Sequence, residues 1–206
     1  MLFKGEYLNG ERNGKGKEYN NNGELKFESE YLNGLRNGKG KEYYKNMVIF
    51  NGEYYNNERW KGKGKEYEND FLIYDGGYSN GKKAGKGKVL YNCGELIYEG
   101  EFLNGKKSGE GKEYNYDMII FEGEYFNDQR NGKGKEYKNG ELVFEGEYLN
   151  GERKGKGKQY WNGKLKFEGE FLKGKRNGKG KEYNYNGNVI YEGEYLNGKR
   201  NGKGKE

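Results

Sequence analysis

Apolar and polar residues alternate along this chain with a period of two, in short segments that recur throughout its length. In residues 25–31, Leu-Lys-Phe-Glu-Ser-Glu-Tyr, the apolar or small residues share one parity and the charged residues share the other. Such alternation is typical of a half-buried β-strand, and the spacing of an amphipathic helix is not seen. The pattern therefore predicts strands.

An aromatic-X-Gly-X-aromatic motif returns every 23 or 24 residues. Its nine copies begin near residues 3, 27, 50, 74, 98, 121, 144, 167 and 191. An aliphatic residue two positions before the leading aromatic, such as Leu142 before Phe144, extends the apolar face. A fixed period of this length marks a repeat architecture in which each copy packs against its neighbours. We expect one repeat array over residues 1–206.

A second short segment follows the first strand of each copy, as in Lys15–Tyr19, after a stretch such as Asn9–Asn13 that suits a hairpin loop. Turns such as Lys138-Asn139-Gly140 join successive copies, because Gly adopts positive φ at little steric cost. We predict an all-β fold, an elongated single-layer antiparallel meander of β-hairpins. At the usual strand separation, nine hairpins would span roughly 85 Å.

The loop length sets the expected register within a hairpin. A loop from Gly10 to Asn13 places Tyr7 opposite Gly16, so that a ring lies over a position without a side chain, while opposite charges pair on the other face. Core packing is the preferred interpretation of these rings, and ligand binding is the alternative. The expected structural columns include Tyr7, Gly16, Tyr125, Gly134, Tyr148, Gly157, Tyr195 and Gly204.

Composition alone would suggest disorder, since 31% of residues are hydrophobic and 35% are charged. The strict period overrules that interpretation, because a thin core along an array needs few apolar residues. The formal charge of +6 comes from interleaved Lys and Glu, whereas a nucleic-acid binder usually carries a more one-sided basic field. We therefore expect no nucleic-acid partner.

The single cysteine, Cys93, lies in a predicted turn and has no partner for a disulfide, which fits a reducing compartment. No leader follows the first residue, and no apolar run is long enough to span a bilayer. A cytoplasmic protein is expected, with a cytoskeletal or membrane-peripheral location.

Catalytic chemistry lacks its usual groups. The chain has no His and no Thr, and its only serines are Ser29, Ser79 and Ser108, so a Ser-His-Asp or Cys-His site is impossible. The carboxylate pair Glu145 and Glu147 recurs in nearly every copy, as a solvated strand face would. Gly10–Gly16 fails as a phosphate-binding loop, since its spacing is one residue short and no Ser or Thr follows the Lys. We expect no enzyme, no cofactor and no metal site.

The order Tyr/Phe-X-Gly-X-aromatic-X-X-Gly-X-X-X-Gly-X-Gly resembles the MORN repeat, the membrane occupation and recognition nexus motif, over essentially the whole chain. Some copies depart from it: Ser29 replaces the first Gly in copy two, Asn57 and Asp128 replace the second in copies three and six, and copy three has an extra residue around Trp60. Leu90 stands where other copies place Tyr. The resemblance implies an array of β-hairpins used in cytoskeletal or membrane-associated scaffolds, often as homodimers, with some members proposed to contact phosphoinositides.

The hairpin loops offer the best candidate for a binding surface. Their cations should line one edge about 10 Å apart, given the strand spacing, where they could meet anionic lipid head groups or a protein partner. The alternative is a solubilising rim, partly neutralised by neighbours such as Glu11, Glu58 and Glu152. The ridge would consist of Arg12, Arg36, Arg59, Lys83, Lys107, Arg130, Arg153, Arg176 and Arg200.

The two ends suggest self-association. Met1–Phe3 already follows the strand pattern, and Glu206 stops inside the second strand of copy nine, so both edges should offer unpaired backbone groups. We expect edge-to-edge contacts that form a closed dimer or a filament. The sequence thus predicts a non-enzymatic scaffold that binds proteins and itself. A module that binds anionic phospholipids is the alternative, and an inhibitory partner of an enzyme or toxin remains open.

Overall fold

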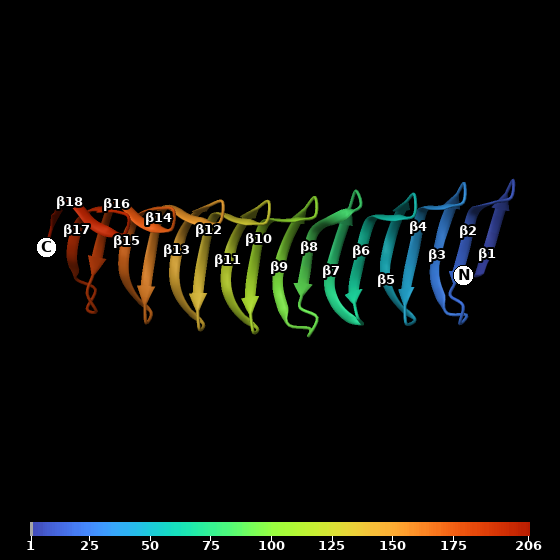
Figure 1. Ribbon diagram of the computed structural model, residues 1–206, viewed down its shortest axis with the longest axis horizontal. Coiled ribbons are helices and arrows are strands. Elements are labelled where there is room, and N and C mark those ends of the chain that lie inside the picture. Colours follow the sequence, from blue (N-terminus) through green and yellow to red (C-terminus); the bar gives the residue numbers. More distant parts are fainter. Residues whose placement is uncertain (1) are drawn as a thin grey trace. The chain divides into compact units, whose positions relative to one another are not determined.

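The computed structural model describes residues 2–206, so the expectation for Met1 lies outside the described residues. These residues form eighteen β-strands and no helix, and the strands within each part of the chain pair antiparallel (Figure 1). The predicted all-β fold with two strands per repeat is confirmed. The strands are β1 Leu2–Leu8, β2 Glu11–Tyr19, β3 Leu25–Leu32, β4 Leu35–Tyr44, β5 Met47–Tyr55, β6 Glu58–Glu68, β7 Phe71–Ser79, β8 Lys82–Leu90, β9 Leu96–Leu103, β10 Lys106–Asn115, β11 Met118–Phe126, β12 Gln129–Lys138, β13 Glu141–Leu149, β14 Glu152–Trp161, β15 Lys164–Leu172, β16 Lys175–Tyr183, β17 Val189–Leu196 and β18 Lys199–Lys205.

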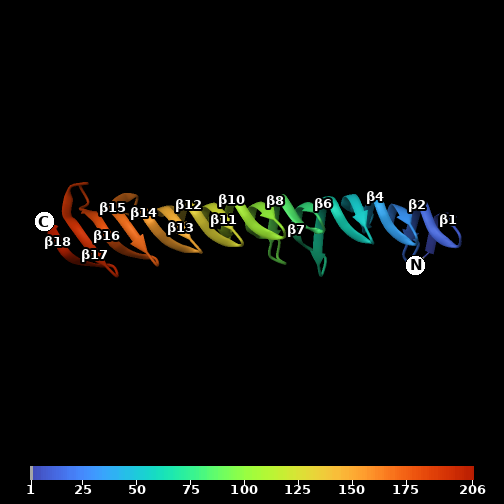
Figure 2. The same cartoon turned by 90° about the horizontal axis from the view of Figure 1, so that it is seen from above.

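The chain contains two compact units. The first unit comprises the residues up to Glu95 together with Phe102–Gly105, and the second comprises Leu96–Glu101 together with Lys106–Glu206. In the first unit β1 to β8 pair antiparallel in chain order. In the second unit β10 to β18 do the same, and Figure 2 shows this succession from above.

Two-residue turns close the hairpins. At Asn150-Gly151 the φ angles are 51° and 85°, and at Asn139-Gly140, which joins two copies, they are 52° and 79°. Two successive residues with positive φ are typical of the tight turn that matches the twist of antiparallel strands. The predicted Asn-Gly junction turn is confirmed, but the longer loop at Asn9–Asn13 was wrong, because β2 already begins at Glu11.

The expected hairpin register was also wrong. Tyr7 lies opposite Arg12, and Gly5 lies opposite Gly16. The same relation holds for Tyr125, Tyr148 and Tyr195, which face Arg130, Arg153 and Arg200, while Gly134, Gly157 and Gly204 face the first glycine of the motif. The two-residue turn brings Arg opposite Tyr, and a β-bulge then adds extra residues to the second strand before the glycines meet.

The second glutamate of the motif supports this bulge. The backbone amide of Lys39 donates to the Glu30 carboxylate at 2.8 Å, and that of Lys133 donates to Glu124 at 3.0 Å. Glu147 occupies the matching position beside Gly155, whose φ is 76°. These carboxylates therefore have a structural contact and are more than a solvated strand face.

Aromatic rings form the core of each unit. Phe121, Phe144 and Phe167 have no exposed area, and they meet their neighbours edge to face. The ring centroids of Phe144 lie 5.6 Å from Tyr148 and 5.1 Å from Phe171 of the next hairpin. Such pairs add about 0.5–1.5 kcal/mol beyond area burial. The interpretation of the aromatic columns as core is confirmed for Tyr125, Tyr148 and Tyr195, but it was wrong for Tyr7, which is 59% exposed in the hairpin β1–β2.

The glycines make room for these rings. The ring that lies over each glycine is, however, not the one that the expected columns paired with it. A methyl group at Gly157 would lie 2.5 Å from Cζ of Phe144, the leading aromatic of its own hairpin. A methyl group at Gly134 would lie 3.2 Å from Cε2 of Tyr148, the second aromatic of the next hairpin. Each ring column therefore lies across two hairpins.

The aliphatic residue ahead of each motif does not simply extend the aromatic face. A second register shift, between Glu136 and Tyr137, sets Leu142 opposite Tyr137. The Tyr137 hydroxyl donates to Glu122 at 2.6 Å, on the face opposite to Phe121. The period of two is broken at this point, and the prediction of one continuous apolar face was wrong.

Candidate interaction surface

The cations predicted to form a loop ridge lie inside strands. Arg130, Arg153 and Arg176 are each the second residue of a strand, directly opposite an aromatic residue of the hairpin. The placement of the ridge in loops was wrong, because the turns contain only two residues. The same strand position holds Arg12, Arg36, Arg59, Lys83, Lys107 and Arg200.

Each of these cations lies against the leading aromatic ring of its hairpin. The guanidinium carbons of Arg130, Arg153 and Arg176 are 4.2 Å from the centroids of Phe121, Phe144 and Phe167. Lys83 repeats this contact in the first unit, with its ammonium 4.1 Å from the ring centre of Tyr74. A cation on a ring face contributes about 0.5–2 kcal/mol, depending on how far it is removed from water.

A glutamate neutralises most of these cations. Arg130 forms an ion pair with Glu113 at 2.6 Å, and Arg59 with Glu42 at 2.8 Å, each partner lying on the preceding hairpin. Arg153 pairs with Glu136 in the same way, with both side chains only about one fifth exposed (21% and 20%). The cations of this row are therefore paired with glutamates and partly buried, and they do not form a free basic ridge.

The ion pairs also affect the pKa of Glu136 and Glu113, which is lowered in both carboxyl groups. Burial on its own would raise the pKa of the Glu136 carboxyl, but hydrogen bonds from Arg153 and Tyr148 outweigh it and hold the pKa below its ordinary value. The Tyr148 hydroxyl donates to Glu136 at 2.8 Å. Each unit thus contains a repeated cluster of ring, cation, carboxylate and phenol that links consecutive hairpins.

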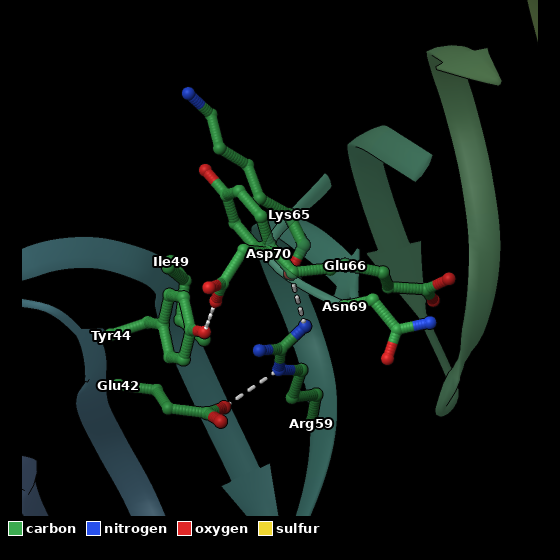
Figure 3. A pocket seen from close by; sticks show the side chains of 9 residues that line it. Glu42, Tyr44, Ile49, Arg59, Lys65, Glu66, Asn69 and Asp70 are labelled. Atoms are coloured by element: carbon green, nitrogen blue, oxygen red, sulfur yellow. Dashed lines mark hydrogen bonds and ion pairs between the residues drawn. The ribbon is translucent and has the colours of Figure 1, made fainter. Parts of the chain in front are cut away.

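The first unit has an open pocket beside its irregular third hairpin. In Figure 3, Arg59 donates to Glu42 and, at 3.0 Å, to the backbone carbonyl of Lys65, while Tyr44 donates to Asp70. The ring of Tyr44 also stacks on Tyr67 with centroids 5.5 Å apart. These charged groups are engaged with one another.

No group of three His, Cys, Asp or Glu side chains suited to a metal ion occurs among residues 2–206. Cys93 is exposed in the predicted turn, where Gly94 has a φ of 91°. The described part of the chain also has no helix with the length and apolar character needed to cross a membrane.

A different surface, which sequence reasoning missed, is exposed and apolar. It consists of the residue just before the tight turn of each hairpin, and we refer to it as the turn row. In the first unit the turn row is Leu8, Leu32, Tyr55, Ser79 and Leu103, and in the second unit it is Phe126, Leu149, Leu172 and Leu196. The signal was present, because an apolar residue follows the second aromatic of the motif in every copy except the fourth.

Side chains of the turn row are open to solvent in both units. Leu8 is 57% exposed and Tyr55 is 52% exposed in the first unit, and Phe126 is 58% exposed in the second. Scattered exposed apolar residues are common on protein surfaces, but aligned ones that form a patch mark sites of interaction. The turn row is therefore the strongest candidate surface for binding a partner.

This fold defines a β-hairpin repeat protein whose surfaces recur from copy to copy. The sequence model of the MORN repeat matches residues 3–24, 27–46, 74–92, 98–117, 121–141, 144–164, 167–189 and 191–206. The chain belongs to the MORN repeat family. Repeats of this family generally mediate protein–protein or membrane interactions, and the family is generally non-enzymatic. No curated protein matches the chain.

The match omits the third copy, whose hairpin β5–β6 also has a register of its own. In hairpin β5–β6, Gly52 lies opposite Gly62, whereas the residue opposite the corresponding glycine of β7, Gly76, is Gly64. The extra residue expected around Trp60 is thus accommodated by a different register, in which Trp60 contacts Tyr55 with ring centroids 5.2 Å apart.

Proposed function

We propose that this protein is a non-enzymatic scaffold that binds other proteins and copies of itself. The observation that carries the proposal is the exposed turn row, which presents an apolar side chain at nearly every hairpin of both units. A repeated apolar surface favours partners that are themselves extended or repeated, because each repeat then adds a similar contact. We expect the protein to act in the cytoplasm, at the cytoskeleton or at a membrane surface.

Binding of anionic phospholipids is the second candidate function. The ion pairs of Arg130 and Arg153 make it less favourable for these cations to bind anionic head groups as a basic ridge. Another observation supports the candidate, since Lys173, Lys175 and Lys199 are exposed beside apolar residues of the turn row. Exposed cations near an anionic membrane contribute about 1 kcal/mol each.

The first test is the mass of the purified protein in solution. Sedimentation velocity over about a hundredfold range of concentration should show the average mass rising with concentration, as mass action requires for self-association. A mass that stays at that of one chain throughout would contradict the self-association.

Co-sedimentation with vesicles separates the second candidate. Vesicles with and without phosphoinositide are compared for the wild-type chain and for a Lys173→Glu, Lys199→Glu variant. Salt-sensitive binding that this variant loses would favour the lipid function over the scaffold. The scaffold proposal expects no such binding.

A further inference from the structure

The turn row of the second unit has four members on successive hairpins. Phe126, Leu149, Leu172 and Leu196 are 58%, 41%, 45% and 51% exposed. Strand spacing places such side chains about 10 Å apart. They form a short apolar line that a partner could cover along its whole length.

Each apolar residue of this line has a polar neighbour directly across the hairpin. Phe126 faces Gln129 and Leu149 faces Glu152. Leu172 faces Lys175, and Leu196 faces Lys199. All four polar side chains are exposed, and within residues 2–206 neither Glu152 nor Lys175 takes part in an ion pair. The residues directly across from the line therefore change along it from neutral, to negative, to positive, and Lys173, which follows Leu172 in the turn, adds a further exposed positive charge.

Backbone hydrogen bonds hold the turns of this line in place. The amide of Gly151 donates to the Arg130 carbonyl of the preceding hairpin at 2.9 Å, and Gly174 donates to Arg153 at 3.0 Å. Gly198 donates to Arg176 at 2.9 Å. The apolar line is thus prearranged, which lowers the entropy lost when a partner binds.

We propose that this line is a two-fold symmetric interface between two copies of the chain, with the two lines running antiparallel. The proposal rests on the self-association put forward above and names its surface. In this arrangement Leu149 of each copy packs near Leu172 of the other, and Phe126 near Leu196. A contact of this kind is isologous and closed, so it forms a dimer and not a filament.

Charge selects the antiparallel alignment. It sets Glu152 of each copy beside Lys175 of the other, and Gln129 beside Lys199. A parallel alignment would place Glu152 of one copy against Glu152 of the other, and each lysine against the same lysine of the other copy. Such like-charge contacts oppose binding. An anionic membrane would meet Glu152 in the middle of the line as a repulsive group. A second copy is therefore the partner that complements the whole line.

Charge reversal on the full chain tests this interface. Glu152→Lys and Lys175→Glu each place two like-charged pairs in the symmetric dimer, so each should weaken dimerisation by about tenfold. The double variant, Glu152→Lys with Lys175→Glu, exchanges the charges and should restore dimerisation to near the wild-type value. Restoration in one polypeptide is expected only if residue 152 of one copy meets residue 175 of another.

Lys138→Glu, an exposed charge reversal at the opposite end of the hairpins, is the matched control and should not change dimerisation. Leu149→Ser with Leu172→Ser should abolish dimerisation while circular dichroism retains the β-sheet spectrum. If the wild-type chain is a monomer at every concentration, the proposed self-association fails and this interface fails with it. If the wild-type chain dimerises and the single and double charge variants dimerise equally well, only this interface is overturned.

Discussion

At the scale of single residues, the fold depends on how glycines and aromatic rings share space. Phe144 has no exposed area, and its ring lies against both Gly146 and Gly157, on the two strands of one hairpin. A side chain at either glycine would occupy the volume of the ring. Glycine is therefore required here for close approach, in strands where its flexibility would otherwise cost stability.

Gly157→Ala should destabilise the protein by about 1–3 kcal/mol, because its methyl group would lie 2.5 Å from Cζ and 2.7 Å from Cε2 of a ring that is packed on all sides. Urea unfolding followed by circular dichroism measures the change. Lys158→Ala, on the neighbouring residue with an exposed side chain, serves as the control and should stay within about 0.5 kcal/mol.

A double-mutant cycle identifies the ring as the cause of this loss. Phe144→Leu provides room for the new methyl group, so the effects of Phe144→Leu and Gly157→Ala should be less than additive by about 0.5–3 kcal/mol. Strict additivity would show that the glycine is needed for some other reason.

Tyrosines on the other face add a pH dependence. Burial, together with a hydrogen bond to Glu122, raises the pKa of Tyr137 to about 12. Burial and a hydrogen bond to Glu145 raise the pKa of Tyr160 to about 12, and burial and a hydrogen bond to Glu168 do the same for Tyr183. The unfolded chain ionises its tyrosines near pH 10. Between these values the unfolded state binds fewer protons than the native state, so stability falls as pH rises.

The free energy of unfolding should therefore be nearly constant between about pH 6 and 9, above the range in which the paired glutamates titrate, and decrease from about pH 10 to 12. Tyr137→Phe should make this decrease shallower, and Glu122→Gln should shift its midpoint to lower pH by removing the carboxylate that favours the neutral phenol. Urea titrations at a series of pH values give the slope. An unchanged slope in both variants would contradict the assignment.

At the scale of strands and hairpins, the sequence predicts most of the elements and misses their register. Period-two alternation and the Asn-Gly turns identify both strands of every copy. The tight turn at Asn9-Gly10 could have been read from its dipeptide, which is the strongest short-range hairpin signal. The longer loop that we expected separates Tyr7 from Arg12, although the two residues lie opposite each other in the structure. This one difference changes every expected contact within the hairpin.

The β-bulges could not be predicted from the sequence of a single strand. A contact such as that between the Glu124 carboxylate and the amide of Lys133 exists only after the strands have paired. The same limit explains the cations, since the position of Arg153 between a ring and Glu136 depends on two strand pairings. The turn row follows directly from the repeat and could have been found.

At the scale of the whole molecule, the repeat makes stability local. Each hairpin contacts the hairpins next to it, as in other repeat proteins, where stability is a sum of repeat and neighbour contributions. The aromatic contacts show this, because within residues 2–206 the ring of Phe144 contacts aromatic rings of its own hairpin and of the next one only. The chain also contains two compact units, each with its own aromatic core.

Unfolding should therefore spread through one unit before it involves the other. Tyr74→Ala removes a fully buried ring of the first unit and should cost about 3–5 kcal/mol, as large-to-small changes in a core do. Hydrogen exchange measured by mass spectrometry should then show faster exchange in β5 to β8 and nearly unchanged exchange in β13 to β18, because openings in repeat proteins follow contiguous cooperative segments. Phe144→Ala is the matched change in the second unit and should give the reverse pattern. Equal loss of protection in both units from either variant would mean that the chain unfolds as one cooperative body and that its stability is not local.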